Sequence, residues 1–166
     1  REIIAMGSQA STLAEGLLSQ QRACRTFDAA RSITAVCQAM TPLARSAGRA
    51  IACTTQSATL VGDPADLRRI ATNLVTNALR HGSGTIVVSL EVVDRVVLTV
   101  RDHGTGIPED LLSSIFTAGV SRGGAGNHGL GMAIVHRLVT ESGGEIEAAN
   151  HGDGGAIFTA SWALAS

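Results

Sequence analysis

Two glycines lead into a helical pattern near residue 130, and this arrangement can bind an anion. Gly129-Leu-Gly131 precedes a stretch from Met132 to about Ser142 in which apolar residues recur at helical spacing. The first N–H groups of a helix have no partner within it, and the positive end of the helix dipole lies beside them. The stretch therefore predicts a site for a negatively charged group.

A carboxylate at the end of an apolar strand face is a second candidate. Val96, Leu98 and Val100 alternate along a strand pattern, and Asp102 has the same parity. Burying a charge is costly unless it is hydrogen-bonded or paired, so we expect Asp102 to have a dedicated partner, in the protein or in a ligand. The other interpretation is a strand-end residue that has reached solvent. The Gly-x-Gly at 104–106 allows close approach of the backbone to another group.

Two amides and a histidine form a third group. Asn73, Asn77 and His81 are four residues apart, so they share one row on the helix predicted for residues 64–81. Asp63 and Pro64 favour the start of this helix, as its cap and its first residue. A solvated polar face is the simpler explanation when this helix is taken alone. A second face of the helix is apolar and is predicted to pack in a core: Leu67, Ile70, Ala71, Leu74 and Ala78.

The composition excludes several classes of protein. The 166 residues have a net charge of -1 and are 45% apolar, which favours one domain with a sizeable core and disfavours binding to nucleic acid or to an anionic membrane. No apolar run approaches the ~20 residues of a membrane span. All 13 basic residues are arginine, which excludes the P-loop lysine and the strand lysine of protein Ser/Thr/Tyr kinases. Cys24, Cys37 and Cys53 lack metal-ligand spacing, so we expect reduced, buried thiols in a cytosolic protein.

The remaining patterns predict the elements that would position these groups. Residues 117–128 contain four glycines and few large apolar side chains, so we expect a mobile loop or lid there. Strands are expected over 49–55, 85–93, 96–102, 145–149 and 156–163, with Trp162 packed at a sheet edge, and helices over 28–47, kinked or restarted near Pro42, and over 109–115.

Residues 1–23 are predicted to form a separate helical segment, with a boundary near residues 24–27. Their apolar side chains step by three and four, the spacing of a coiled-coil seam: Ile3, Met6, Ala10, Leu13 and Leu17. A helix of this length is marginal alone, so it should pack on its own domain or on a partner helix. We therefore divide the chain into residues 1–23 and a main domain over 24–166.

In this order, the motifs resemble the ATP-binding domain of bacterial sensor histidine kinases, within the superfamily shared with gyrase, Hsp90 and MutL. The stretch NLVTNALRH at 73–81 resembles the N box of this family. DHGTGI at 102–107 resembles the first glycine box, and NHGLGM at 127–132 resembles the second. Phe116 occupies the position of the F box. The resemblance implies a two-layer α/β sandwich of the Bergerat type, with a mixed sheet, helices on one face and an ATP lid.

The resemblance also assigns roles to individual residues. Asn77 would bind the Mg²⁺ that bridges the phosphates, because a hard cation prefers oxygen ligands, and Asn77 and Arg80 would be the catalytic pair. Asp102 would accept a hydrogen bond from the adenine amino group. The other nucleotide contacts would come from the same helix, the glycine boxes, the F box and the lid: Asn73, Arg80, His81, Gly104, Gly106, Ile107, Phe116, Arg122, Gly129, Leu130 and Gly131.

The sequence departs from the family pattern at three positions. Asn127 stands where many members have the first glycine of the second box, and Arg122 lies near the usual lid lysine. Asn73 stands where ATP-hydrolysing relatives and anti-sigma serine kinases carry a glutamate that acts as general base. An amide cannot accept a proton at neutral pH, whereas a neutral imidazole acceptor needs no such base. Asn73 therefore favours phosphoryl transfer to histidine over hydrolysis.

The function implied is a cytoplasmic protein histidine kinase that binds ATP and Mg²⁺. No histidine lies in residues 1–23, so this segment would be the C-terminal part of a dimerisation helix whose phosphoacceptor histidine lies upstream. The implied partners are that dimerisation domain, in a homodimeric parent, and a response regulator, without contact to nucleic acid or membrane. The alternatives are a non-catalytic ATP-binding regulatory module and, less favoured because of Asn73, an anti-sigma-type Ser/Thr kinase.

Overall fold

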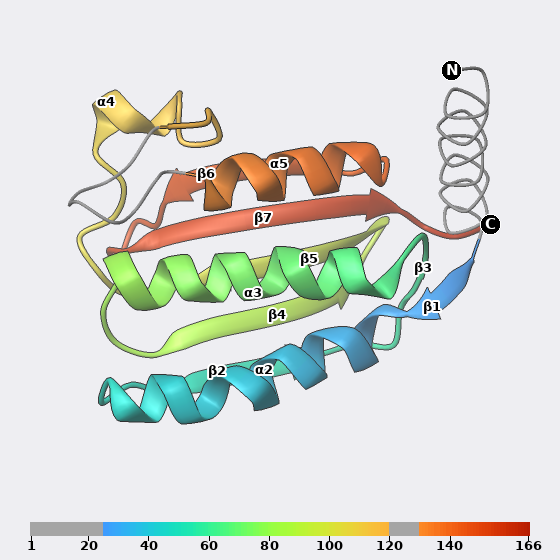
Figure 1. The fold of residues 1–166 in the computed structure, drawn as a ribbon, viewed down its shortest axis with the longest axis horizontal. Coiled ribbons are helices and arrows are strands. Elements are labelled where there is room, and N and C mark those ends of the chain that lie inside the picture. Colours follow the sequence, from blue (N-terminus) through green and yellow to red (C-terminus); the bar gives the residue numbers. More distant parts are fainter. Residues whose placement is uncertain (1–24, 120–129) are drawn as a thin grey trace, which may run out of the picture.

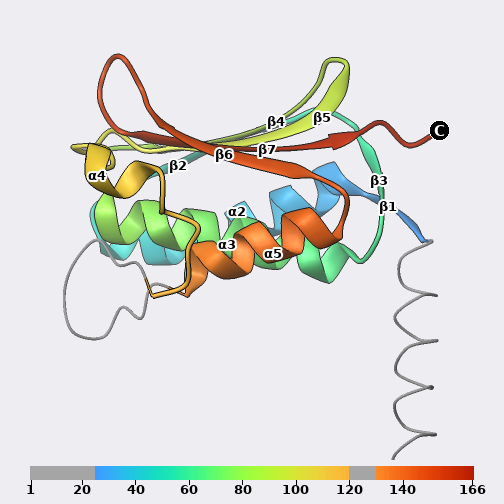
Figure 2. The same ribbon diagram turned by 90° about the horizontal axis from the view of Figure 1, so that it is seen from above.

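A computed structural model describes residues 25–119 and 130–166, which fold into two layers, a sheet and a set of helices on one of its faces (Figure 1, Figure 2). The helices are α2 (Ala29–Ser46), α3 (Pro64–His81), α4 (Glu109–Leu112) and α5 (Gly131–Glu141). The strands are β1 (Thr26–Asp28), β2 (Ile51–Thr55), β3 (Thr59–Val61), β4 (Ile86–Val92), β5 (Arg95–Arg101), β6 (Glu145–Asn150) and β7 (Ala156–Ala163). The predicted segment 1–23 and the larger part of the predicted lid lie outside the described residues.

The main sheet is mixed and has the order β2-β4-β5-β7-β6. Strands β2 and β4 are parallel, and the other neighbours are antiparallel. Helices α2, α3 and α5 lie side by side on one face of this sheet (Figure 2). This arrangement confirms the α/β sandwich predicted from the sequence.

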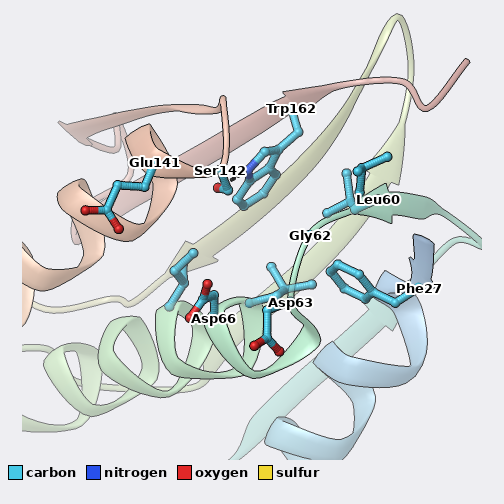
Figure 3. A pocket seen from close by; sticks show the side chains of 11 residues that line it. Phe27, Leu60, Gly62, Asp63, Asp66, Glu141, Ser142 and Trp162 are labelled. Carbon is cyan, nitrogen blue, oxygen red and sulfur yellow. Dashed lines mark hydrogen bonds between the residues drawn. The ribbon is translucent and has the colours of Figure 1, made fainter. Parts of the chain in front are cut away.

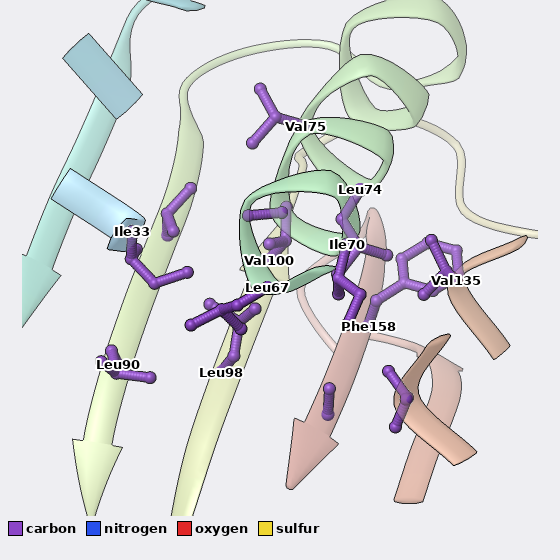
Figure 4. Close-up of a cluster of buried hydrophobic side chains, with 14 of the residues drawn as sticks. Ile33, Leu67, Ile70, Leu74, Val75, Leu90, Leu98, Val100, Val135 and Phe158 are labelled. Carbon is purple, nitrogen blue, oxygen red and sulfur yellow. The ribbon is translucent and has the colours of Figure 1, made fainter. Parts of the chain in front are cut away.

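Helix α3 is the central helix, between α2 and α5. It begins as predicted, because Pro64 is its first residue and the Asp63 carboxylate accepts a hydrogen bond from Ala65 N at 2.8 Å. Its predicted apolar face is buried, together with Val75. Figure 4 shows this face packed against the sheet and against Phe158 of β7 and Val135 of α5.

Helix α2 is one continuous helix, so the predicted restart near Pro42 is wrong. The Asp28 carboxylate caps the first turn through Arg31 N at 3.1 Å. Buried residues occur both before and after the proline, with Cys37 on one side and Ala44 on the other. Proline has no backbone N–H, so the helix loses one hydrogen bond there. Burial of the same helix face on both sides of Pro42 offsets the cost of that lost bond.

Two features of the strands differ from the sequence prediction. Trp162 is buried rather than at an edge, because β7 lies between β5 and β6, and its indole N–H donates to Ser142 Oγ at 2.9 Å. Strands β1 and β3 form a separate antiparallel pair that the sequence analysis did not predict. Three-residue strands are too short to show an alternating pattern.

Candidate functional site

The predicted site elements converge at one end of the sandwich. The last turn of α3, the end of β5 and the loop after it, α4 and the first turn of α5 lie at the same end of the molecule (Figure 1). Residues far apart in the sequence meet here, since Gly82 and Gly155 both pack against Asp102. The antiparallel β5–β7 pairing brings the residues after β5 beside the turn before β7.

Asp102 is a buried carboxylate at the end of β5. Only 3% of its surface is exposed, and its Oδ1 accepts hydrogen bonds from Gly104 N at 2.8 Å and Ala156 N at 3.3 Å. The interpretation of Asp102 as a solvated strand-end residue is therefore wrong. The two backbone hydrogen bonds offset part of the free-energy cost of removing the charge from water. They also fix the orientation of the carboxyl group.

Three glycines allow the backbone to close around Asp102. A Cβ atom on Gly82 would collide with the Asp102 carboxyl group, and one on Gly155 would collide with the Asp102 carbonyl oxygen. A Cβ on Gly104 would lie 2.8 Å from the Cα of Gly82. The sequence analysis identified Gly104 but not the other two glycines, whose requirement comes from contacts across the fold.

Asn150 holds the second half of the first glycine box. Its Oδ1 accepts from Ile107 N at 2.6 Å, and its Nδ2 donates to Ile107 O at 2.8 Å. Gly106 has a φ of 82°, and a Cβ there would lie 2.5 Å from Asn150 Oδ1. Both Gly106 and the buried Ile107 are therefore fixed by the last residue of β6, which the sequence analysis did not select.

The amide row lies on α3 beside its buried face. Asn73 and Asn77 are half-buried, as is His81, and Arg80 is exposed. The Nδ2 atom of Asn77 is buried and has no hydrogen-bond partner among the described residues. A buried N–H donor without a partner in the described protein indicates a position where a ligand acceptor can bind.

Phe116 follows α4 and packs toward α5. Its ring lies 5.7 Å from that of His136 and 6.2 Å from that of Phe158, in an edge-to-face arrangement with Phe158. Phe116 thus connects the segment before the predicted lid to the first turns of α5 and to the core.

The first turn of α5 has no side-chain cap from the part of the chain that the structure describes. Leu130 occupies the N-cap position, is 51% exposed and carries no hydrogen-bond acceptor in its side chain, and Gly131 is the first helical residue. The N–H groups of the first turn have no partner within the helix, as an anion site requires. Arg122 and Gly129, the other predicted residues of this region, lie outside the described residues.

A pocket of about 390 Å³ lies at the opposite end of α3 (Figure 3). Its walls come from β1, β3, the first turns of α3, the end of α5 and Trp162. None of the predicted site residues lines it, so it is separate from the site above. Within the described ranges, no helix is long and apolar enough to span a bilayer, and no three acidic, histidine or cysteine side chains form a metal-binding group.

The family model of the histidine kinase-, DNA gyrase B- and HSP90-like ATPases matches residues 62–166. This range is more than half of the chain and includes the buried Asp102, the amide row and the start of α5. The chain belongs to this ATPase family.

Two relatives within the family are sensor histidine kinases. The chain is 46% identical over 99 residues to the sensor histidine kinase component HK1 of Mycobacterium tuberculosis, a match that covers 57% of this chain and 58% of the relative. It is 43% identical over 102 residues to the signal transduction histidine-protein kinase AfsQ2 of Streptomyces coelicolor, covering 58% of this chain and 19% of the relative. The chain thus spans less than two thirds of either protein.

Solved structures confirm the fold of this ATPase-family domain. Full-length ShkA in complex with AMPPNP superposes with a TM-score of 0.75 at 30% identity, covering 86% of this chain and 32% of ShkA. The mycobacterial sensor histidine kinase MprB superposes with a TM-score of 0.74 at 21% identity, covering 85% of this chain and 97% of that chain.

Proposed function

We propose that residues 24–166 form the ATP-binding catalytic domain of a sensor histidine kinase. In the parent protein, residues 1–23 would be the C-terminal part of its dimerisation helix. The observation that carries this proposal is Asp102, a buried carboxylate oriented by two backbone donors and enclosed by glycines. The match of more than half of the chain to sensor histidine kinases supports it.

Asp102 provides selectivity for adenine. The adenine amino group is a donor and satisfies a carboxylate, whereas guanine presents a carbonyl oxygen at the corresponding position of its ring. Placing that oxygen against a buried anion would set two acceptors against each other with no donor between them, which costs binding energy. Gly104, Gly106 and Ile107 would form the adjacent wall, with Asn150 fixing its backbone.

The phosphates would lie between α3 and the start of α5. The first N–H groups of α5 can donate to phosphate oxygens, with Leu130 and Gly131 at the N-terminus and Gly129 and Arg122 contributing from the preceding segment. Asn77, whose amide nitrogen has no partner in residues 25–119 and 130–166, would hold Mg²⁺ through its amide oxygen. Asn73, Arg80 and His81 would complete this side, and Phe116 would support the lid. The bound cation would neutralise part of the phosphate charge.

The reaction would be in-line transfer of the γ-phosphoryl group of ATP to an imidazole nitrogen. The P–N bond forms as the bond from phosphorus to the bridging oxygen of ADP breaks. Because Asn73 cannot act as a base, this chain's contribution would be positioning and charge neutralisation, with Asn77 and Arg80 nearest the reacting group. The acceptor would be a histidine of the dimerisation domain of the homodimeric parent, and a cytoplasmic response regulator would receive the phosphoryl group next.

The second candidate is an ATP-binding regulatory module without transfer activity. Loss of Mg²⁺-linked binding would favour it, because transfer depends on the cation and simple nucleotide binding does not. The match to sensor histidine kinases favours the kinase.

Calorimetric titration of the chain with ATP, with and without Mg²⁺ and with GTP as the control, tests the proposal. We expect ATP to bind, Mg²⁺ to tighten the binding, and GTP to bind at least about tenfold more weakly, since one lost hydrogen bond to a charged group costs at least about 1.5 kcal/mol. Equal affinity for ATP and GTP would contradict the role of Asp102. An ATP affinity that is the same with and without Mg²⁺ would favour the regulatory module.

Asn77→Ala tests the cation site in the same titration. We expect the variant to keep its fold, because Asn77 makes no hydrogen bond through Nδ2 to the described protein, and to lose the tightening by Mg²⁺ while retaining ATP binding in its absence. If Mg²⁺ still tightens ATP binding to the same extent, another residue holds the cation.

A further inference from the structure

Arg49 connects two parts of the site without belonging to any of its motifs. It follows Gly48, which ends the segment after α2 with a φ of 70°, and it precedes β2. Its backbone N–H donates to Ala44 O at 2.9 Å, and the next residue, Ala50, accepts from Ile86 N at 2.9 Å. The side chain therefore starts from a fixed backbone between α2 and the sheet.

The guanidinium group of Arg49 binds the end of α3. Its Nη1 donates to Ala78 O at 2.8 Å and to Leu79 O at 3.2 Å. These carbonyl groups belong to the last turn of the helix, where the negative end of the dipole favours a cation. Ala78 O also accepts from the backbone N–H of Gly82 at 3.0 Å, so Arg49 adds a second donor to a carbonyl that the helix cap already uses. Ala78 directly follows Asn77, so Arg49 fixes the turn that carries the candidate cation ligand.

The same guanidinium group binds the loop after α3. Its Nε donates to Gly84 O at 2.8 Å. This loop is joined to the residue after Asp102, because His103 N donates to Ser83 O at 2.9 Å and Ser83 Oγ donates to His103 O at 3.1 Å. A ring nitrogen of His103 also lies 2.8 Å from Thr85 O.

We propose that Arg49 is a positioning residue for the nucleotide site, and that it holds the Asn77 turn and the Asp102 floor in one arrangement. Gly82 lies between these two parts, against the Asp102 carboxyl group, so a shift of the loop changes the distance between the base site and the cation site. This inference rests on the proposed function. It adds a residue outside the recognised boxes that sets their relative geometry.

An arginine is required for this role because three carbonyl groups are bound by two different nitrogens of one planar group. A lysine carries a single compact ammonium group and cannot reach the helix end and the loop in the same fixed geometry. Arg49→Lys should therefore retain the favourable charge at the helix end and lose part of the link to Gly84.

The test compares Arg49→Gln and Arg49→Lys with a matched control, Arg95→Gln, in the whole chain. Arg95 is also half-buried and also donates to a backbone carbonyl, Ser161 O at 3.4 Å, but it starts β5, whereas Asp102 follows the end of that strand. Each variant is titrated with ATP, with and without Mg²⁺, at a temperature well below its measured Tm. Amide hydrogen exchange is measured on the same proteins without nucleotide.

We expect Arg49→Gln to weaken Mg-ATP binding about tenfold, to reduce the tightening by Mg²⁺, and to increase exchange both at residues 78–84 and at 102–104. For Arg49→Lys, we expect an ATP affinity and amide exchange rates between those of Arg49→Gln and those of the unchanged chain. Arg95→Gln should lower Tm and leave ATP affinity unchanged. A purely stabilising arginine would instead lower Tm without changing the affinity of the folded protein.

The outcomes separate this inference from the proposed function. If the unchanged chain does not bind ATP, the proposed function fails, and exchange alone then decides whether Arg49 links the two segments. If the unchanged chain binds ATP and Arg49→Gln binds it equally, the inference is overturned. It is also overturned if exchange rises at 78–84 and not at 102–104, because the two segments are then not coupled.

Discussion

At the scale of single residues, Asp102 and Asn77 have complementary environments. The Asp102 carboxylate is oriented by Gly104 N and Ala156 N, while the Asn77 amide nitrogen is buried without a partner among the described residues. The first group is fixed by the protein before any ligand arrives, and the second has unused hydrogen-bonding capacity. These environments suit selection of the base by Asp102 and binding of the charged end of the nucleotide by Asn77.

Asp102→Asn should weaken ATP binding about tenfold to a hundredfold without unfolding the protein. The asparagine oxygen can still accept from Gly104 N and Ala156 N, so the local backbone should remain in place. Its amide nitrogen, however, would meet the adenine amino group as a second donor, which loses a hydrogen bond to a charged group worth about 1.5–3 kcal/mol. Calorimetry measures the affinity, and thermal unfolding checks the fold. Unchanged ATP affinity would refute contact between Asp102 and adenine.

The two described cysteines should differ in reactivity. Cys37 is buried on α2 and Cys53 is exposed on β2. Burial, followed by the hydrogen bond that the Cys37 thiol donates to Cys53 and by the charge of Cys53, raises the pKa of the Cys37 thiol well above its ordinary range. In a Cys24→Ser background at pH 8, iodoacetamide should modify Cys53 and leave Cys37 unmodified until urea unfolds the protein.

The raised pKa of the Cys37 thiol also predicts how the stability of the fold changes with pH. Because folding favours the protonated Cys37 thiol, its contribution is fully present below the unfolded thiol pKa of about 8.5 and is lost as the pH rises above it. Urea unfolding at pH 7 and pH 10 measures this change in stability. The alkylation of Cys53 and Cys37 by iodoacetamide is measured by peptide mapping with mass spectrometry. Equal alkylation of both cysteines in the native protein would contradict this assignment.

At the scale of elements, the site depends on the ends of helices and strands. The last turns of α3 carry Asn77 and Arg80, the end of β5 leads to Asp102, and the first turn of α5 has no side-chain cap from the described residues. Contacts from other elements fix these ends, with Arg49 binding the end of α3 and Asn150 binding the loop at Ile107. Each contact joins residues that are distant in sequence.

Asn150→Ala should loosen the first glycine box. Both backbone groups of Ile107 lose their partners, and a hydrogen bond left unmade at a partly buried group costs on the order of 1–3 kcal/mol. We expect faster amide exchange at Ile107 and several-fold weaker ATP binding. Asn150→Asp is the matched control, since it keeps the acceptor for Ile107 N and loses the donor to Ile107 O, and it should give a smaller effect. Unchanged exchange at Ile107 in the alanine variant would exclude this role.

At the scale of the whole molecule, one core holds the helices and the sheet in register. Leu74 of α3 is fully buried among side chains from the strands and from the neighbouring helices (Figure 4). The face of α3 that carries Leu74 adjoins the row of Asn73 and Asn77, so core packing and ligand binding use adjacent faces of one helix.

Leu74→Ala should lower the free energy of unfolding by about 2–5 kcal/mol, because it leaves a cavity in the closely packed core. Leu43→Ala is the matched control, since Leu43 is 54% exposed on α2 and its truncation should change stability by less than about 0.5 kcal/mol. Urea denaturation monitored by circular dichroism measures both. Similar losses in the two variants would show that burial at Leu74 does not decide stability.

The elements of the fold and the chemical groups of the site were predictable from the sequence, because they depend on local patterns. Helical spacing and a capping aspartate identified α3, alternation identified β4 and β5, and the parity of Asp102 identified a carboxylate at the end of an apolar face. Strands β1 and β3 were missed because three residues give no periodicity, and the position of Trp162 was wrong because strand order depends on contacts between distant segments.

The sequence by itself thus determined which residues have binding chemistry and which elements carry them, since periodicity and capping act over a few neighbouring residues. Only the tertiary structure decided that Asp102 is buried, that Gly82 and Gly155 must lack a side chain, and that Asn150 and Arg49 hold the site. The physical reason is that burial and hydrogen bonding to backbone groups arise where segments distant in sequence meet.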